Sequence, residues 1–306
     1  MAKARALDRR RRSVRNIRKI TRTMELIATA RFKKAMDRSV AARDYTKQLV
    51  KILENIASVG ADVVHPLLDV RPTKRAAVLV LSGNRGLCGG YNSNIVRQSV
   101  AILGQWRSEQ VDTDVAVSGK RGISALKFRG IHMDERYTSF EDKPAFDAVM
   151  PIGRAYLEAY ASGKIDRLDV VYTRFHSIAR QEAVTEMLLP LKAPEIAGAV
   201  PGGAVPGGAA SGTATTQLAS QEYDFYPSAE SILEEILPAS FLSRLFKCFL
   251  DAAVSEQVAR MVAMKAASEN AAGLIKNLSR RYNRARQSQI TGEIMEILGG
   301  VEALKQ

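Results

Sequence analysis

The placement of proline constrains this chain more than any other feature of its sequence. All ten prolines fall between Pro66 and Pro238, so residues 1–65 and 239–306 contain none. Because proline removes a backbone donor and clashes with the preceding helical turn, two proline-free stretches of this length favour long helices at both ends of the chain. Glycine supports the same prediction for the N-terminal stretch, since the first glycine is Gly60.

Both proline-free arms carry mostly small or apolar residues at alternating steps of three and four, the spacing of a coiled-coil seam. In the N-terminal arm these residues are Val14, Ile17, Thr21, Met24, Ala28, Arg31 and Ala35. In the C-terminal arm they are Met261, Met264, Ser268, Ala271, Ile275, Leu278, Tyr282 and Ala285 and then, after a slip of one position, Ile290, Ile294, Ile297, Val301 and Leu304. A helix of about 60 residues is roughly 90 Å long, too long for one globular domain to conceal. We therefore predict that the two arms pair as an antiparallel coiled coil.

The middle of the chain alternates strand and helix patterns. Strands are expected over residues 76–82, 111–118 and 168–175, with 182–191 as an edge strand, and helices over 92–106, 119–128 and 145–161. This alternation predicts βαβ units and a mostly parallel sheet. A Pro/Gly/Ala-rich tract over residues 195–221 then predicts a flexible loop.

The expected fold class is therefore α/β, an antiparallel coiled coil combined with a Rossmann-like domain. The predicted division is a coiled-coil helix over 1–65, a globular base over 66–194, a flexible loop over 195–222 and a second coiled-coil helix over 223–306.

A glycine-rich turn, Gly83 to Gly90, follows the first expected strand, where a dinucleotide loop would lie. Its glycines are spaced G-x-x-G-x-x-G-G, which is neither G-x-G-x-x-G nor a P-loop, and no Gly-Lys-Ser/Thr follows. The acidic residues after it, Asp112 and Asp114, lie at the start of the second expected strand rather than at its end. A structural turn is favoured over a nucleotide site, and a dinucleotide-dependent enzyme is the weaker alternative.

The charge of the chain points to an acidic partner. Lys and Arg number 45 and Asp and Glu 32, a net charge of +13. Many of these cations crowd the start of the sequence, at Arg5, Arg9–Arg12, Arg15, Arg18, Lys19 and Arg22. Because no aromatic residue precedes Phe32, base stacking has no candidate there. A solvated helix face or docking to an acidic protein loop is favoured, and a basic coiled-coil nucleic-acid binder remains as an alternative.

The sequence offers few residues that could act in catalysis or bind a metal. Cys88 and Cys248 lie far apart without a CxxC, and His65, His132 and His176 are scattered too widely for a zinc site. None of the histidines has a nucleophile or carboxylate arranged beside it in sequence, and no apolar run reaches the roughly 18 residues of a membrane span. We expect no catalytic residue, no metal, no cofactor, no direct membrane insertion and a reducing compartment.

Three blocks of the sequence resemble one family, the gamma subunit of F-type ATP synthase. The first is residues 14–28, VRNIRKITRTMELIA, and the second is residues 85–92, RGLCGGYN. The third is SEQ at 255–257 and RMVAMK at 260–265, continuing through YNRARQ at 282–287 to Ile290 and Thr291. The likeness runs through nearly the whole chain in the right order.

The resemblance implies a non-catalytic rotor shaft of a proton- or sodium-driven ATP synthase. Its paired helices would enter a hexamer of alpha and beta subunits, and its base would bind the epsilon subunit and the c-ring, with no nucleic acid as partner. Acidic loops of the beta subunits would meet its positive charge. Position by position, the resemblance implies that five residues contact the hexamer: Met24, Arg260, Arg286, Gln287 and Thr291. It implies that Tyr223, in the base, lies near the c-ring. It implies a peripheral protein on the cytoplasmic face of a bacterial plasma membrane, because the helical pattern begins within about 15 residues of Met1.

Three features depart from the family pattern. Asn84 stands where the family usually has Asp, and Tyr226 stands where an acidic residue is common before the proline. The 195–221 tract lies where plastid relatives carry a regulatory dithiol, but it contains no cysteine. Thiol control of that kind is therefore not expected.

Overall fold

The computed structural model describes residues 2–58, 65–140, 143–191 and 229–303. They fall into two compact units. The coiled-coil unit comprises residues 1–31, 87–89 and 258–306, and the base unit comprises 32–86 and 90–257. Two long helices, α1 (Ala2–Ser58) and α6 (Ala229–Ala303), each contribute to both units.

A five-stranded sheet forms the centre of the base unit. Its order is β3-β2-β1-β4-β5, in which β1 (Arg75–Leu81), β2 (Asp112–Ser118), β3 (Glu135–Tyr137) and β4 (Arg167–Phe175) run parallel. The edge strand β5 (Gln181–Leu189) pairs antiparallel with β4. The predicted mostly parallel sheet is confirmed, while β3 is an addition because three polar-flanked residues give no strand signal.

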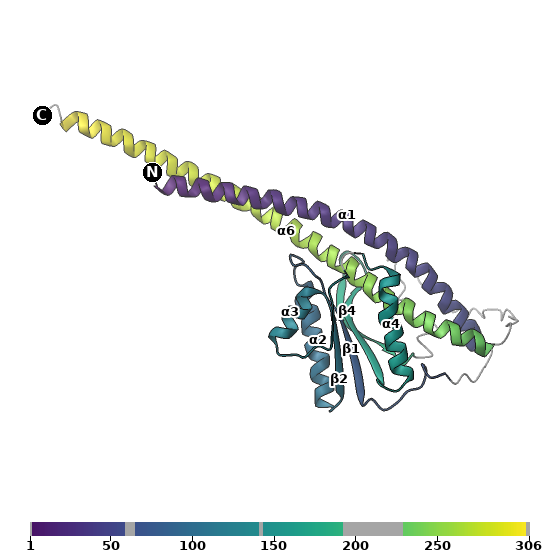
Figure 1. The fold of residues 1–306 in the computed structure, drawn as a ribbon. Helices are drawn as coiled ribbons and strands as arrows, with labels where there is room; N and C mark the ends of the chain where they lie inside the picture. The colour runs from purple at the N-terminus through teal and green to yellow at the C-terminus, as the bar shows by residue number, and fades with distance from the viewer. Residues whose placement is uncertain (1, 59–64, 141–142, 192–228, 304–306) are drawn as a thin grey trace, which may run out of the picture. The chain divides into compact units, whose positions relative to one another are not determined.

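Helices cover both faces of this sheet (Figure 1). They are α2 (Tyr91–Ser108), α3 (Lys120–Phe128) and α4 (Phe146–Ala161), close to the three predicted helices. Alternation along β1 explains why both faces need cover. Ala77, Leu79 and Leu81 belong to the core shared with α4 and α6, whereas Ala76 and Val78, also buried, point to the opposite face.

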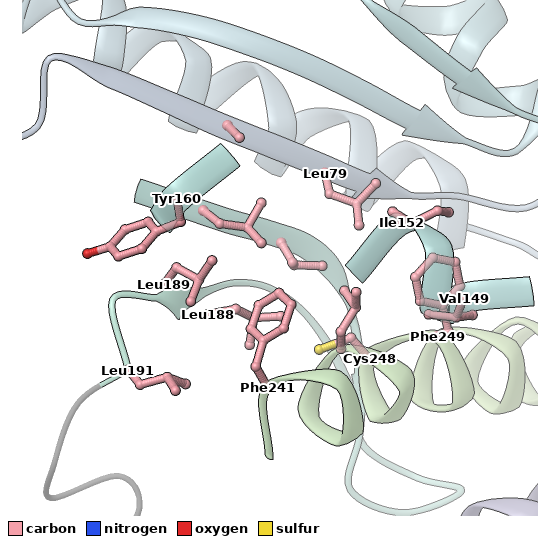
Figure 2. Packing of buried hydrophobic residues seen from close by; sticks show 14 of the residues in the cluster. Leu79, Val149, Ile152, Tyr160, Leu188, Leu189, Leu191, Phe241, Cys248 and Phe249 are labelled. Atoms are coloured by element: carbon pink, nitrogen blue, oxygen red, sulfur yellow. The ribbon is translucent and has the colours of Figure 1, made fainter. Parts of the chain in front are cut away.

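The main core lies between the sheet, α4 and the first part of α6. Figure 2 shows Val149 and Ile152 of α4 and Phe241, Cys248 and Phe249 of α6 meeting side chains of the sheet. Residues 233–252 of α6 therefore cover a sheet face, a role that its sequence does not distinguish from coiled-coil pairing. The helix also includes Pro238, so it begins before the last proline of the chain.

In the coiled-coil unit the start of α1 runs alongside the end of α6 in the opposite direction (Figure 1). Burial repeats every seven residues on both helices, the signature of a left-handed coiled coil. On α1 the less exposed positions include Leu7, Val14, Thr21 and Ala28, and on α6 they include Met264, Ala271, Leu278 and Ala285. The predicted antiparallel coiled coil is confirmed.

Two parts of the predicted seam differ. Ile17 is 50% exposed, although Met24, seven residues further along the same row of the predicted seam, is half-buried. The continuation of the C-terminal stripe is also exposed, from 46% at Ile290 to 66% at Ile297. Leu304, the last predicted seam residue, lies outside the described residues.

Candidate partner-binding site

The glycine-rich turn of the base unit is filled by the chain itself. The Gly83 amide donates to Asn92 Oδ1 at 2.9 Å, and a Cβ added at Gly83 would lie 2.8 Å from Glu256 Cδ. A carboxylate against the turn repels a phosphate at the position where a dinucleotide fold would bind one. The turn therefore does not fit a pyrophosphate.

Asn84 secures this turn through both ends of its side-chain amide. Its Nδ2 donates to the carbonyls of Thr138 (3.1 Å) and Phe140 (2.9 Å), and its Oδ1 accepts from the Lys120 amide at 2.9 Å. An ionised Asp has no donor for the two carbonyls. Asn84, which departs from the family pattern, therefore uses both its amide donor and its amide acceptor in hydrogen bonds that hold the turn.

A charged cluster joins the two helices of the coiled-coil unit. The guanidinium of Arg11 lies over the Tyr282 ring, with its Cζ 4.6 Å from the ring centroid. Arg11 and Arg12 both contact Asp8, at 2.6 and 2.8 Å. The hydrogen bond from Arg11 and the positive charge of Arg12 lower the pKa of Asp8 below its ordinary value.

Beside this cluster lies a hollow of about 440 Å³. Its lining is strongly basic, with Arg286 of α6 facing the same space as Arg9 and Arg12 of α1. One carboxylate, that of Asp8, shares the lining. The hollow therefore offers cationic groups from both helices to an acidic surface.

Many large apolar side chains on the outside of the coiled-coil unit are exposed, although pairing of the two helices does not require them. Six large apolar side chains on its flanks are 48–59% exposed: Ile17, Ile20, Leu26, Ile27, Val262 and Leu274. Toward the end of α6, another six are 46–66% exposed: Ile290, Ile294, Met295, Ile297, Leu298 and Val301. Because Ala4 lines the same hollow as Ile290, α6 continues beyond the start of α1 here. Clustered apolar exposure of this kind marks an interaction surface.

The structure distributes the predicted site residues along the helices rather than gathering them. Arg286, Gln287 and Thr291 are exposed close to the hollow, and Met24 is half-buried about 20 Å along α1 from Arg11. Arg260 is 7% exposed and lies about 39 Å along α6 from Arg286. Tyr223 lies outside the described residues, as does Tyr226.

Sequence reasoning missed Asp8 and the flanking apolar residues such as Ile20 and Ile27. Asp8 had a usable signal, because it is the one acidic residue among the first 24 and stands three and four positions before Arg11 and Arg12. Ile20 and Ile27 had a weaker signal, a seven-residue spacing displaced by one position from the seam.

The remaining candidates for chemistry occupy ordinary structural positions. His65 Nδ1 accepts from the Leu67 amide at 3.1 Å, and burial lowers the pKa of His65. The Nε2 atoms of His132 and His176 lie 3.7 and 3.9 Å from nearby carboxylates. Across the part of the chain that the structure describes, no three His, Cys, Asp or Glu side chains gather as a metal site would require. In the same ranges no helix combines the length and apolar character needed to cross a bilayer.

The fold and these surfaces define a class of protein: a two-helix coiled coil joined to an α/β base, with exposed surface for partners on its helices. A family model described as ATP synthase matches residues 3–304. An ATP synthase gamma chain from Rhodopirellula baltica is 59% identical over 308 residues and covers 100% of both chains. Another gamma chain, from Frankia casuarinae, is 39% identical over 301 residues, covering 97% of this chain and 96% of the relative.

Solved structures show the same fold at lower identity. The rotor of the Euglena gracilis mitochondrial ATP synthase is 19% identical with a TM-score of 0.61, covering 94% of this chain and 99% of that one. The central stalk and c-ring structure from Tetrahymena thermophila contains a chain 20% identical with a TM-score of 0.55, covering 81% of this chain and 99% of that one.

The chain belongs to the ATP synthase gamma chain family. This confirms the resemblance carried by the three sequence blocks. The family is neither a dinucleotide-dependent enzyme nor a nucleic-acid binder, the two alternatives that the sequence left open. The gamma chain is a non-catalytic subunit of a rotary complex whose catalytic sites lie in the beta subunits.

Proposed function

We propose that this chain is the turning shaft of its ATP synthase, with its coiled coil inside a hexamer of alpha and beta subunits. The parts of α1 and α6 in the coiled-coil unit supply the shaft, and the base unit supplies the base. The predicted loop over residues 195–222 lies outside the described residues. The base binds the epsilon subunit and the c-ring, through which a proton or sodium current drives rotation. The chain associates peripherally with the membrane complex, on the cytoplasmic face of a bacterial plasma membrane.

One observation carries this proposal: α6 continues past the start of α1 with apolar side chains exposed. Ile294 and Ile297 are 52% and 66% exposed, on a helix that α1 no longer accompanies. Apolar contact is non-directional, so it lets a helix turn against a surrounding ring with little preference for one angle. Directional hydrogen bonds at the same positions would favour particular angles.

Charge provides the second part of the mechanism. Arg9 and Arg12 of α1 and Arg286 of α6 line one hollow, where they face outward for acidic loops of the beta subunits. Charge-assisted contacts at an exposed surface transmit force and exchange readily as the shaft turns. Gln287 and Thr291, exposed within the next two turns of α6, extend this contact. Met24 and Arg260 contribute further hexamer contacts farther from the hollow along the two helices. Tyr223 contributes a contact between the base and the c-ring.

The test is reconstitution with the alpha and beta subunits of the same enzyme. We expect one copy of this chain to co-purify with each hexamer. The double variant Arg286→Ala/Gln287→Ala should assemble but hydrolyse ATP about tenfold more slowly, because it loses a charge that lines the hollow and the exposed amide next to it. Single-molecule rotation of a rod attached to the base would report whether turning accompanies hydrolysis.

The matched control is Arg154→Ala, which removes an exposed arginine from α4 of the base. It should leave turnover within about twofold of the unsubstituted complex. Equal turnover of the double variant and the control would remove Arg286 and Gln287 from the proposed site. Failure of the unsubstituted chain to assemble with the hexamer would contradict the shaft itself.

A further inference from the structure

The base unit has a groove of its own between α2 and α3. It has a volume of about 700 Å³. Val100 of α2 and Phe128 of α3, 37% and 91% exposed, provide its apolar surface, and the buried Val96 of α2 lies at its floor. An aromatic side chain left this exposed beside a groove is a feature of recognition surfaces rather than of a closed core.

The charge around this groove has one sign. Arg97 of α2, Arg121 of α3 and Arg129 just after α3 line it. The two helices together contain five lysines and arginines, and neither contains Asp or Glu: Arg97, Arg107, Lys120, Arg121 and Lys127. A groove with an apolar centre and cations at its edges is complementary to an apolar stripe flanked by carboxylates.

Hydrogen bonds and buried side chains hold the two helices that form the groove in place. The Arg121 amide donates to the Gly83 carbonyl at 3.1 Å, which fixes the start of α3 against the turn after β1. Arg129 Nη1 donates to the Ala125 carbonyl at 3.2 Å at the other end of the helix. On α2, Ile95, Ser99 and Trp106 are buried, so the helix that forms the other wall is anchored along its length. A groove with fixed walls binds without the cost of ordering them.

We propose that the α2–α3 groove is a docking site for an acidic amphipathic helix of another protein. Its apolar residues lie on Val96, Val100 and Phe128, and its carboxylates pair with Arg97, Arg121 and Arg129. The concave form favours a helix over a flat bilayer, since a helix with its side chains is about 10–12 Å across and can enter a groove. The absence of acidic residues from both walls sets the required charge of the partner.

The binding test uses the full-length chain and a fluorescent peptide of about 18 residues, with Leu at helical i, i+3, i+4 and i+7 spacing and Glu elsewhere. A second peptide replaces every Glu with Lys. We expect the Glu peptide to bind and the Lys peptide not to bind. Affinity for the Glu peptide should fall as salt rises, because the flanking charges are exposed.

Two variants test the two parts of the groove. Arg97→Glu/Arg121→Glu should weaken the Glu peptide by about tenfold or more, and Phe128→Ser should weaken it by a similar factor. Arg154→Glu, which reverses a charge that is also exposed, on α4, should change affinity less than about twofold. Circular dichroism of each variant checks that the fold is intact. Equal binding of both peptides, or unchanged binding after charge reversal, would overturn the proposal.

A second measurement works in the intact ATP synthase. A photoreactive benzoylphenylalanine at position 128 should crosslink to an acidic helical segment of a protein, whereas the same group at position 154 should not give that product. Sedimentation with vesicles of phosphatidylglycerol and phosphatidylcholine tests the membrane as occupant. Phe128-dependent vesicle binding without peptide binding, or a crosslink at 128 only to lipid, would contradict the proposal.

Discussion

Arg11 and Tyr282 join α1 to α6 through a cation–π contact of 4.6 Å within the coiled-coil unit. The same guanidinium donates to Asp8 at 2.6 Å, so one arginine connects an ion pair on its own helix to an aromatic ring on the other. An apolar seam of small residues tolerates sliding of one helix along the other. A polar pair at a single level specifies one register.

We predict that Tyr282→Ala loosens this end of the coiled coil, whereas Tyr282→Phe does not. The ring provides both the cation–π contact and part of the seam, together worth roughly 2 kcal/mol, and Phe keeps the ring. Hydrogen exchange of the amides of residues 5–18 and 276–290 measures the effect. Faster exchange is expected in Tyr282→Ala only. If both variants exchange like the unsubstituted chain, the contact does not hold the helices together.

A pair of glycines provides a matched test of packing in the base unit. Gly153 of α4 lies so close to α6 that an added Cβ would collide with Leu242 and come within 3.2 Å of Leu245 Cδ2. Gly104 of α2 has nothing within 4 Å of the same position. Helix propensity favours Ala over Gly by about 1 kcal/mol at both sites, but overpacking costs about 1–3 kcal/mol.

We therefore predict opposite signs for the same substitution. Gly104→Ala should raise the free energy of unfolding by about 0.5–1 kcal/mol, and Gly153→Ala should lower it by about 1–2 kcal/mol. The one tryptophan of the chain, Trp106, is buried in the base unit, so its fluorescence during urea unfolding reports on this unit. A gain in both variants would mean that α6 yields to the added methyl group.

The sequence predicts the coiled coil well because its signal is periodic and long. On α1, Val14, Thr21 and Ala28 repeat at steps of seven, as do Met264, Ala271 and Leu278 on α6, and the structure buries or half-buries each of them. Periodicity reveals that a helix has an apolar face but not which element covers it. For this reason the exposed stripe that includes Ile294 has the same pattern as the buried one.

The same limitation explains what was missed elsewhere. Residues 233–252 of α6 cover a sheet face, and a helix on a sheet has the same period as a helix on a helix. The strand Glu135–Tyr137 is too short and polar to be recognised. The α2–α3 groove has no motif, because Arg97 and Phe128 come together only when two helices pack side by side. The hollow was partly predictable. The resemblance points to Arg286 as a partner contact, and the charge pattern points to Arg9–Arg12.

Both cysteines should be unreactive in the folded chain. Cys88 and Cys248 are 2% and 1% exposed, and burial raises the pKa of the Cys248 thiol well above its ordinary value. Because the thiolate is the reactive form, burial blocks access to both thiols and also lowers the nucleophilicity of Cys248. A coloured disulfide reagent should give almost no signal with native protein and two thiols per chain in denaturant. The variant Cys88→Ser should give one. Rapid labelling of either thiol in native protein would contradict the packing described.

Asp169 predicts a pH dependence of stability with a definite sign. The residue is fully buried at the β4 register shift beside Leu168, and burial raises the pKa of its carboxyl above the ordinary value. Arg167 limits this rise, since its Nε lies 3.1 and 3.0 Å from the two carboxylate oxygens. The native state therefore binds the Asp169 proton more tightly than the unfolded state does. This residue's contribution to stability is largest at low pH and is lost as pH rises through its native pKa.

The variant Asp169→Asn lacks this titration. We expect its free energy of unfolding, relative to that of the unsubstituted chain, to increase as pH rises above about 4, the ordinary pKa of Asp. Urea unfolding followed by Trp106 fluorescence at several values between about pH 3 and pH 7 measures the difference. Adding Arg167→Met to the Asp-containing chain should enlarge the pH dependence, because the opposing hydrogen bond and charge are gone. A difference between Asp and Asn that falls as pH rises would show that Arg167 stabilises the carboxylate more than burial destabilises it, and a constant difference would show that the two effects cancel.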